Sequence, residues 1–181
     1  MRQFCGCILL LLATLVLCLA APQAQVESSN INKILKSFPG YHLLTLQERN
    51  SDAREFILRH FPKDNPSVVQ ADFNGDGHPD FALLLKDGKP GTAKFVILFC
   101  SRDAICKNVF EVDIPNSGEV YIRPKPIRSQ VSQTDAIETD NHPPAVTLSS
   151  TGIELTYLGQ AKVVYYWNRR DKKIEAVQTE E

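Results

Sequence analysis

The chain has 181 residues, of which 43% are hydrophobic and 23% are charged, and its formal net charge at pH 7 is −1. These values are typical of a globular protein and argue against a disordered chain. A nearly neutral chain lacks the basic surface that binds nucleic acids, so we expect no nucleic-acid partner.

The N-terminus, residues 1–20, has the pattern of a secretory signal peptide. Arg2 precedes the apolar stretch CILLLLATLVLCLAA, and the small residues Cys18 and Ala20 predict cleavage after Ala20. Two alternatives stay open: an uncleaved anchor, for which the apolar stretch is barely long enough, and a lipid anchor at Cys18. We therefore expect an exported protein, periplasmic or secreted, that meets a membrane only through such an anchor.

A flexible segment over residues 21–28 and a single domain over residues 29–181 would follow the signal. Two of the five cysteines, Cys100 and Cys106, lie in that domain. A close pair in an exported domain predicts a disulfide, which would stabilise the fold by about 2 kcal/mol. A metal pair or two free thiols are the other interpretations, but no further cysteine or flanking histidine completes a zinc site.

Two short helices are expected first. The apolar residues of 29–38 recur at helical spacing, and Pro39 ends that segment. In the second helix, residues 51–61, Asp52 and Glu55 fit a capping box and Pro62 follows. Residues 41–47 between them predict a short strand.

Strands are expected from residue 67 onward. The pattern predicts strands at 67–73, 81–86, 92–100 and 107–114, and then a long, partly ordered surface connection over 115–145, which is rich in proline. A meander of three strands follows at 152–159, 162–168 and 174–178. In the first of these strands Leu155 alternates with Glu154 and Thr156, so the last two are expected on the opposite, polar face. The fold class is therefore α+β with a mainly antiparallel sheet.

The stretch ADFNGDGHPDFALLL carries oxygen-bearing side chains at positions one, three, five and nine from Asp72. Calcium prefers such oxygen ligands, and Gly77 permits the bend that would turn the His78 backbone carbonyl inward. An Asx-rich turn is the alternative, but three carboxylates repel one another unless a cation offsets their charge. The sequence thus predicts one calcium site, with the ligands Asp72, Asn74, Asp76, His78 (through its carbonyl) and Asp80.

Position twelve of that stretch is Leu83, where an EF-hand needs a bidentate glutamate, so an EF-hand is excluded. The motif DFNGDGHPDFALL instead resembles the calcium loop of FG-GAP and VCBS type repeats, Asp-x-Asn/Asp-Gly-Asp-Gly-x-x-Asp before an apolar strand. That resemblance implies the same five ligands. It covers about fifteen residues, and a single loop does not imply the propeller fold of those repeats. The general layout also resembles small exported bacterial proteins of unassigned function.

Three functions follow as hypotheses. The first is a calcium-stabilised, non-catalytic domain that binds a protein partner through its sheet or through the 115–145 loop. The second is a periplasmic inhibitor or immunity-type protein against a secreted toxin, and the third is a calcium-dependent hydrolase. No catalytic residue can be assigned, since none of the four histidines pairs with another at metal-ligand spacing. Tyr165, Tyr166 and Trp167 are candidates for a binding surface.

Overall fold

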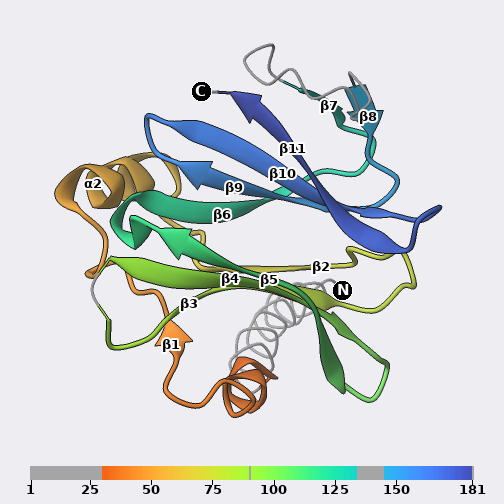
Figure 1. Cartoon of the computed structure of the whole chain (residues 1–181), viewed down its shortest axis with the longest axis horizontal. Helices are drawn as coiled ribbons and strands as arrows, with labels where there is room; N and C mark the ends of the chain where they lie inside the picture. Colours follow the sequence, from red (N-terminus) through yellow and green to blue (C-terminus); the bar gives the residue numbers. More distant parts are fainter. Residues whose placement is uncertain (1–29, 90, 134–144, 181) are drawn as a thin grey trace, which may run out of the picture. The chain divides into compact units, whose positions relative to one another are not determined.

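The computed structural model describes residues 30–89, 91–133 and 145–180 (Figure 1). The chain divides into two compact units, residues 1–39 and 40–181. In the first unit residues 30–35 are helical, within the predicted 29–38 helix, whereas the predicted signal peptide and the 21–28 segment lie outside the described residues. No helix in the described residues is long and apolar enough to cross a membrane.

The second unit contains two larger antiparallel sheets (Figure 1). One has the order β1 (His42–Leu43), β3 (Asp80–Lys86), β4 (Thr92–Cys100) and β5 (Cys106–Pro115). The strand β2 (Val68–Ala71) also pairs with β3, along residues 80–83, while β1 pairs with residues 85–86. We call this five-stranded sheet sheet A.

Sheet B has the order β11 (Lys173–Glu180), β10 (Ala161–Asn168), β9 (Gly152–Tyr157) and β6 (Val120–Lys125). A small hairpin joins β7 (Gln130–Ser132) to β8 (Ala145–Thr147), and the helices of this unit are α2 (Ser51–His60) and the short η1 (Ser117–Glu119). All strand pairs are antiparallel, so the predicted mainly antiparallel architecture is confirmed, as is the C-terminal meander of β9, β10 and β11.

The main hydrophobic core lies between the two sheets. Side chains alternate across each strand, and one face of each strand supplies the core, with Leu84 from β3, Phe95 and Ile97 from β4, and Ile153 and Leu155 from β9. All five are fully buried. The alternation predicted for residues 152–159 is therefore present, and it orients sheet B.

The opposite face of sheet B holds a second, smaller core beside the β7–β8 hairpin. It contains Val164 and Tyr166 of β10, Val177 of β11, Val131 and Leu148. This explains why β10 is apolar on both faces, because each face packs against a different layer.

The prediction of a surface connection over residues 115–145 is wrong in part. This segment contains the strands β6 and β7 and the start of β8. The prolines of this segment had argued against strands in the sequence. Pro124 lies within β6, which forms an edge of sheet B, and an edge strand tolerates a residue without an N–H donor. Residues 134–144 of the predicted connection lie outside the described residues.

The helix α2 begins with a different cap from the predicted one. The Asn50 side chain accepts a hydrogen bond from the Ala53 N–H at 2.8 Å, so Asn50, and not Asp52, is the N-cap residue. The helix ends where it was expected, before Pro62.

A buried arginine joins several segments near α2. Arg49 is 3% exposed, and its guanidinium donates to the carbonyls of Val120 (2.8 Å), Leu44 (3.1 Å), Thr45 (2.8 Å) and Pro66 (3.2 Å) and to the hydroxyl of Ser67 (2.7 Å). Burial lowers the pKa of Arg49 to about 10.

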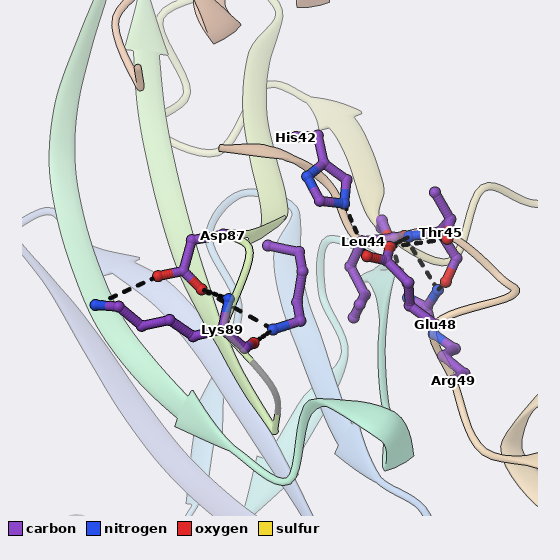
Figure 2. A network of polar contacts seen from close by, with 9 residues as sticks. His42, Leu44, Thr45, Glu48, Arg49, Asp87 and Lys89 are labelled. Atoms are coloured by element: carbon purple, nitrogen blue, oxygen red, sulfur yellow. Dashed lines mark hydrogen bonds and ion pairs between the residues drawn. The ribbon is translucent and has the colours of Figure 1, made fainter. Parts of the chain in front are cut away.

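Beside Arg49, Glu48 holds the same segment. It accepts hydrogen bonds from the Thr45 N–H and hydroxyl and contacts the His42 ring (Figure 2). Glu48 and Arg49 thus fix the segment between β1 and α2.

Candidate functional site

The acidic loop, residues 72–79 with Asp80 at its exit, connects β2 to β3. The two strands pair up to the register Ala71↔Asp80, so the loop closes a hairpin. Its exit leads directly into β3, in which all seven residues are buried. The acidic loop is therefore attached to one of the most buried strands of the unit.

Asp72 organises the loop through its carboxylate. Oδ1 accepts hydrogen bonds from the N–H groups of Gly75 (2.6 Å) and Asp76 (3.1 Å), and Oδ2 accepts one from Gly77 (2.9 Å). The φ angles of Gly75 and Gly77 are +78° and +85°, a region that other residues rarely adopt. The two glycines thus let the backbone wrap around the Asp72 carboxylate.

Asn74 and Asp76 form the outer part of the loop. Asn74 Oδ1 accepts from the Asp76 N–H at 2.8 Å, and its Nδ2 donates to Asp76 Oδ2 at 3.0 Å. Asp76 Oδ1 accepts from the His78 N–H at 2.8 Å. The hydrogen bonds from His78 and Asn74 lower the pKa of Asp76, so this exposed carboxylate stays ionised at neutral pH.

Asp80 has a different environment, because it is fully buried. Oδ2 accepts from the Phe73 N–H at 3.0 Å, and Oδ1 accepts from the Cys100 N–H at 2.9 Å. Burial raises the pKa of Asp80 to about 6, although the backbone hydrogen bonds from Cys100, Phe73 and Asn74 favour the ionised form. Asp80 therefore ties the base of the acidic loop to the end of β4.

The disulfide lies at that same end of β4. Cys100 and Cys106 are opposite each other in the β4–β5 register and are bonded, with an S–S distance of 2.04 Å. The predicted pair is confirmed. It closes the connection between the two strands, and one of its two cysteines, Cys100, donates the backbone hydrogen bond to Asp80.

A cation that the sequence pattern did not reveal lies against the loop. The guanidinium of Arg169, from the turn between β10 and β11, is so close to Gly75 that a Cβ built on this glycine would lie 1.9 Å from Nη2. The turn that carries Arg169 reaches the acidic loop only in the folded chain, so no local sequence motif predicts this contact. A positively charged side chain therefore lies against the backbone of the acidic loop at Gly75.

The predicted ligands are close in the chain, but they are held by hydrogen bonds within the loop. Among the residues that the structure describes, no three His, Cys, Asp or Glu side chains are grouped so that they could hold a metal ion. The donor set still suits calcium chemically, because Asp72 Oδ2 and the two carboxylate oxygens of Asp76 each accept one hydrogen bond and keep a second lone pair. An ion would compete with the Asn74 amide for Asp76 Oδ2.

The aromatic candidates of β10 have mostly structural positions. Tyr165 is 8% exposed in the core between the sheets, and Tyr166 is 9% exposed in the smaller core. Trp167 packs edge-on against Phe99, with ring centroids 5.0 Å apart. Trp167 and Tyr166 also line a groove of about 660 Å³, together with Arg169 and Arg170.

These features define an antiparallel β domain with an acidic hairpin loop held by a buried aspartate and flanked by an arginine. Comparison of the chain with protein-family models, with curated proteins and with solved structures finds no match.

Proposed function

We propose that this protein is an exported, calcium-stabilised domain without catalytic activity, which acts by binding a partner through one of its surfaces. The observation that carries the proposal is the wrapping of the acidic loop around the carboxylate of Asp72, with three loop N–H groups donating to it. An ordinary two-strand turn needs no such arrangement, because a tight turn of two residues suffices to connect antiparallel strands.

The charges of the loop support a cation as its ligand. Asp72, Asp76 and Asp80 lie within nine residues, and ionised carboxylates that share a small volume destabilise the fold unless a cation is near. Arg169 lies against the loop backbone at Gly75, but it forms no ion pair with these carboxylates among the described contacts. A divalent ion bound by Asp72, Asn74, Asp76, Asp80 and the His78 carbonyl would provide the compensating charge.

The role of the ion would be structural. Asp80 connects the loop to the backbone of Cys100 in β4, so an ion in the loop would hold the β2–β3 hairpin and the disulfide-bonded end of sheet A together. The loop has no bidentate glutamate at position twelve, and its affinity would resemble that of extracellular modules, with a Kd on the order of 10⁻⁴ to 10⁻³ M.

Export is supported by two features of the sequence. The first is the signal-like pattern of residues 1–20. The second is the disulfide, since such bonds persist mainly in oxidising compartments. An extracellular or periplasmic location would also supply calcium at the concentrations that a loop of modest affinity needs.

The test is a thermal melt of the chain from Ala21 to Glu181 under oxidising conditions, with calcium and with excess chelator. At a hundredfold excess over its Kd, calcium should stabilise the fold by about 2.7 kcal/mol, which is about 5–10 °C in melting temperature for a domain of this size. Asp76→Ala should abolish the shift in melting temperature, because it removes one of the proposed calcium ligands. The variant should still fold, because Asp76 is exposed and contributes little to packing.

Asp103→Ala is the matched control, since Asp103 is an exposed aspartate in the turn between β4 and β5, outside the acidic loop. This variant should keep the full calcium shift. A wild-type chain that melts at the same temperature with calcium and with chelator, or an Asp76→Ala variant that still responds, would contradict a calcium-stabilised loop.

A further inference from the structure

An open groove of about 660 Å³ lies between the strand β8 and the turn from β10 to β11 (Figure 1). Val146, Thr147 and Ser149 line it from β8 and the residues that follow, and Trp167 and Arg170 line it from the end of β10 and the turn. All of these residues belong to the same compact unit. The volume lies in the range of ligand sites, so the groove can hold a short segment of another chain.

The strand β8 presents an unpaired backbone edge to this groove. Among the described strands β8 pairs only with β7. The Leu148 N–H donates to the Ser129 carbonyl on the β7 side at 3.0 Å, and successive residues of an antiparallel strand direct their backbone groups to opposite sides. The N–H and C=O groups of Thr147 therefore point away from β7. Thr147 is exposed and lines the groove, so an extended chain can pair with it.

The two carboxylates that line the groove already have partners. Glu175 accepts a hydrogen bond from the Tyr166 hydroxyl at 2.7 Å and forms an ion pair with Lys173 at 3.1 Å. Asp171 accepts a hydrogen bond from the Asn168 side-chain amide at 3.0 Å. These bonds within the turn and β11 also occupy the charge of Lys173.

The two arginines of the groove have no carboxylate partner in the described part of the chain. Arg169 lies against the backbone of Gly75. Arg170 is exposed, and its guanidinium forms no ion pair or side-chain hydrogen bond with a described residue. An arginine binds a carboxylate through two parallel hydrogen bonds, so Arg170 favours an acidic group in the groove.

Trp167 adds an apolar surface and a means of detection. Its ring packs edge-on against Phe99 and is only partly buried, so part of it faces the groove. It is the single tryptophan of the chain. Its fluorescence therefore reports on this groove alone.

We propose that this groove binds an extended, acidic segment of a partner protein. The segment pairs with the backbone of Thr147 as an added strand, and one of its carboxylates binds Arg170. This inference rests on the proposed function, in that the protein acts by binding a partner, and it names the surface and the chemistry of that partner. It does not require calcium.

The test uses the capped pentapeptide Ser-Val-Glu-Val-Ser as the probe and follows the fluorescence of Trp167 in the full chain. The peptide should produce a saturable change. The same peptide with glutamine in place of glutamate should bind about fivefold more weakly, as expected for one exposed ion pair. Hydrogen exchange at the Thr147 amide should slow when the peptide binds, because that N–H gains a partner.

Arg170→Gln should weaken binding of the glutamate peptide about fivefold and leave binding of the glutamine peptide unchanged, so that the two peptides bind this variant equally. Arg54→Gln is the matched control, because Arg54 is an exposed arginine on α2, outside the groove. This variant should bind both peptides as the wild type does.

Two results would overturn the proposal: no saturable change in Trp167 fluorescence, or equal binding of the two peptides by the wild type. Unchanged exchange at the Thr147 amide would overturn the added strand. The titration is run with calcium and with excess chelator. Peptide binding that fails in both, beside an intact calcium shift in the thermal melt, contradicts this groove and leaves the calcium-stabilised loop standing, and the opposite pair of results does the reverse.

Discussion

Gly75 is the residue of the acidic loop that the structure constrains most strictly. Its φ of +78° lies in the left-handed region, and the Arg169 guanidinium occupies the space that a side chain would need. These are separate constraints, since the first concerns the backbone and the second concerns a neighbour from a distant turn. They can be separated by mutation.

We expect Gly75→Ala to lower the free energy of unfolding by about 1–2 kcal/mol from the backbone conformation alone, and by more from the contact with Arg169. Adding Arg169→Ala should recover only the second part, because it removes the contact and leaves the backbone strain. Urea denaturation of the two single variants and the double variant measures the backbone contribution and the Arg169 contribution separately.

Gly88→Ala is the control for this series, because Gly88 has no positive φ and open space around its Cβ position. It should leave stability nearly unchanged. If Gly75→Ala also proves neutral, the loop backbone is not held in the conformation described for it.

At the scale of elements, Arg49 connects parts of the fold that are distant in sequence. Its five hydrogen bonds reach the segment after β1, the residues before β2, and the start of β6. We expect Arg49→Met, which keeps much of the side-chain volume, to destabilise the unit by about 3–5 kcal/mol, because buried carbonyls lose their donors.

The matched variant is Arg59→Met on α2, where the side chain is 68% exposed and pairs with Glu55. An exposed pair of this kind contributes about 0.5 kcal/mol or less. Guanidinium chloride unfolding of the two variants gives the comparison. Equal losses for Arg49 and Arg59 would mean that the buried hydrogen bonds of Arg49 do not hold these elements.

Some of these elements can be predicted from the sequence and others cannot. Strands with a simple pattern, such as β4 and β9, are found from the alternation or the length of their apolar runs. The strand β6 is missed because Pro124 argues against a strand, and only the sheet order reveals that this strand is an edge. Thr156 is predicted on a polar face, but it is buried in the folded chain.

The acidic loop follows the same rule. Its place between two strands, its glycines and the disulfide partner of Cys100 can be read from the sequence, since each depends on neighbours in the chain. Two other contacts cannot be predicted from the sequence. These are the contact of Arg169 with Gly75 and the hydrogen bond from the Cys100 N–H to Asp80, because each joins segments that only the folded sheets bring together.

For the whole molecule, the core between the sheets predicts how stability depends on alkaline pH. Tyr165 lies in that core with the rings of Phe95 and Phe110 at 4.9 and 5.2 Å. Burial raises the pKa of Tyr165 to about 12, from an ordinary value of 10.0. The folded state therefore favours the neutral phenol.

Because the folded pKa is the higher one, this stabilisation is complete below pH 10 and is lost as the pH rises from about 10 to about 12. The loss should reach about 2–3 kcal/mol. Urea unfolding at pH 8, 10 and 11.5 measures it, and Tyr165→Phe should show a smaller loss. A variant that loses as much stability as the wild type would rule out Tyr165 as the cause.

The position of β6 has one more consequence for the whole molecule. Its outward edge offers few free donors: the Val120 carbonyl accepts from Arg49, the Ile122 N–H donates to the Pro66 carbonyl, and Pro124 has no N–H. An exposed strand edge is a template on which another chain can add a strand. With neither Ile122 nor Pro124 able to donate, β6 is a poor template for a further strand, so strand pairing between copies through sheet B should favour β11. Fibril growth, which needs two open edges, is disfavoured along sheet B.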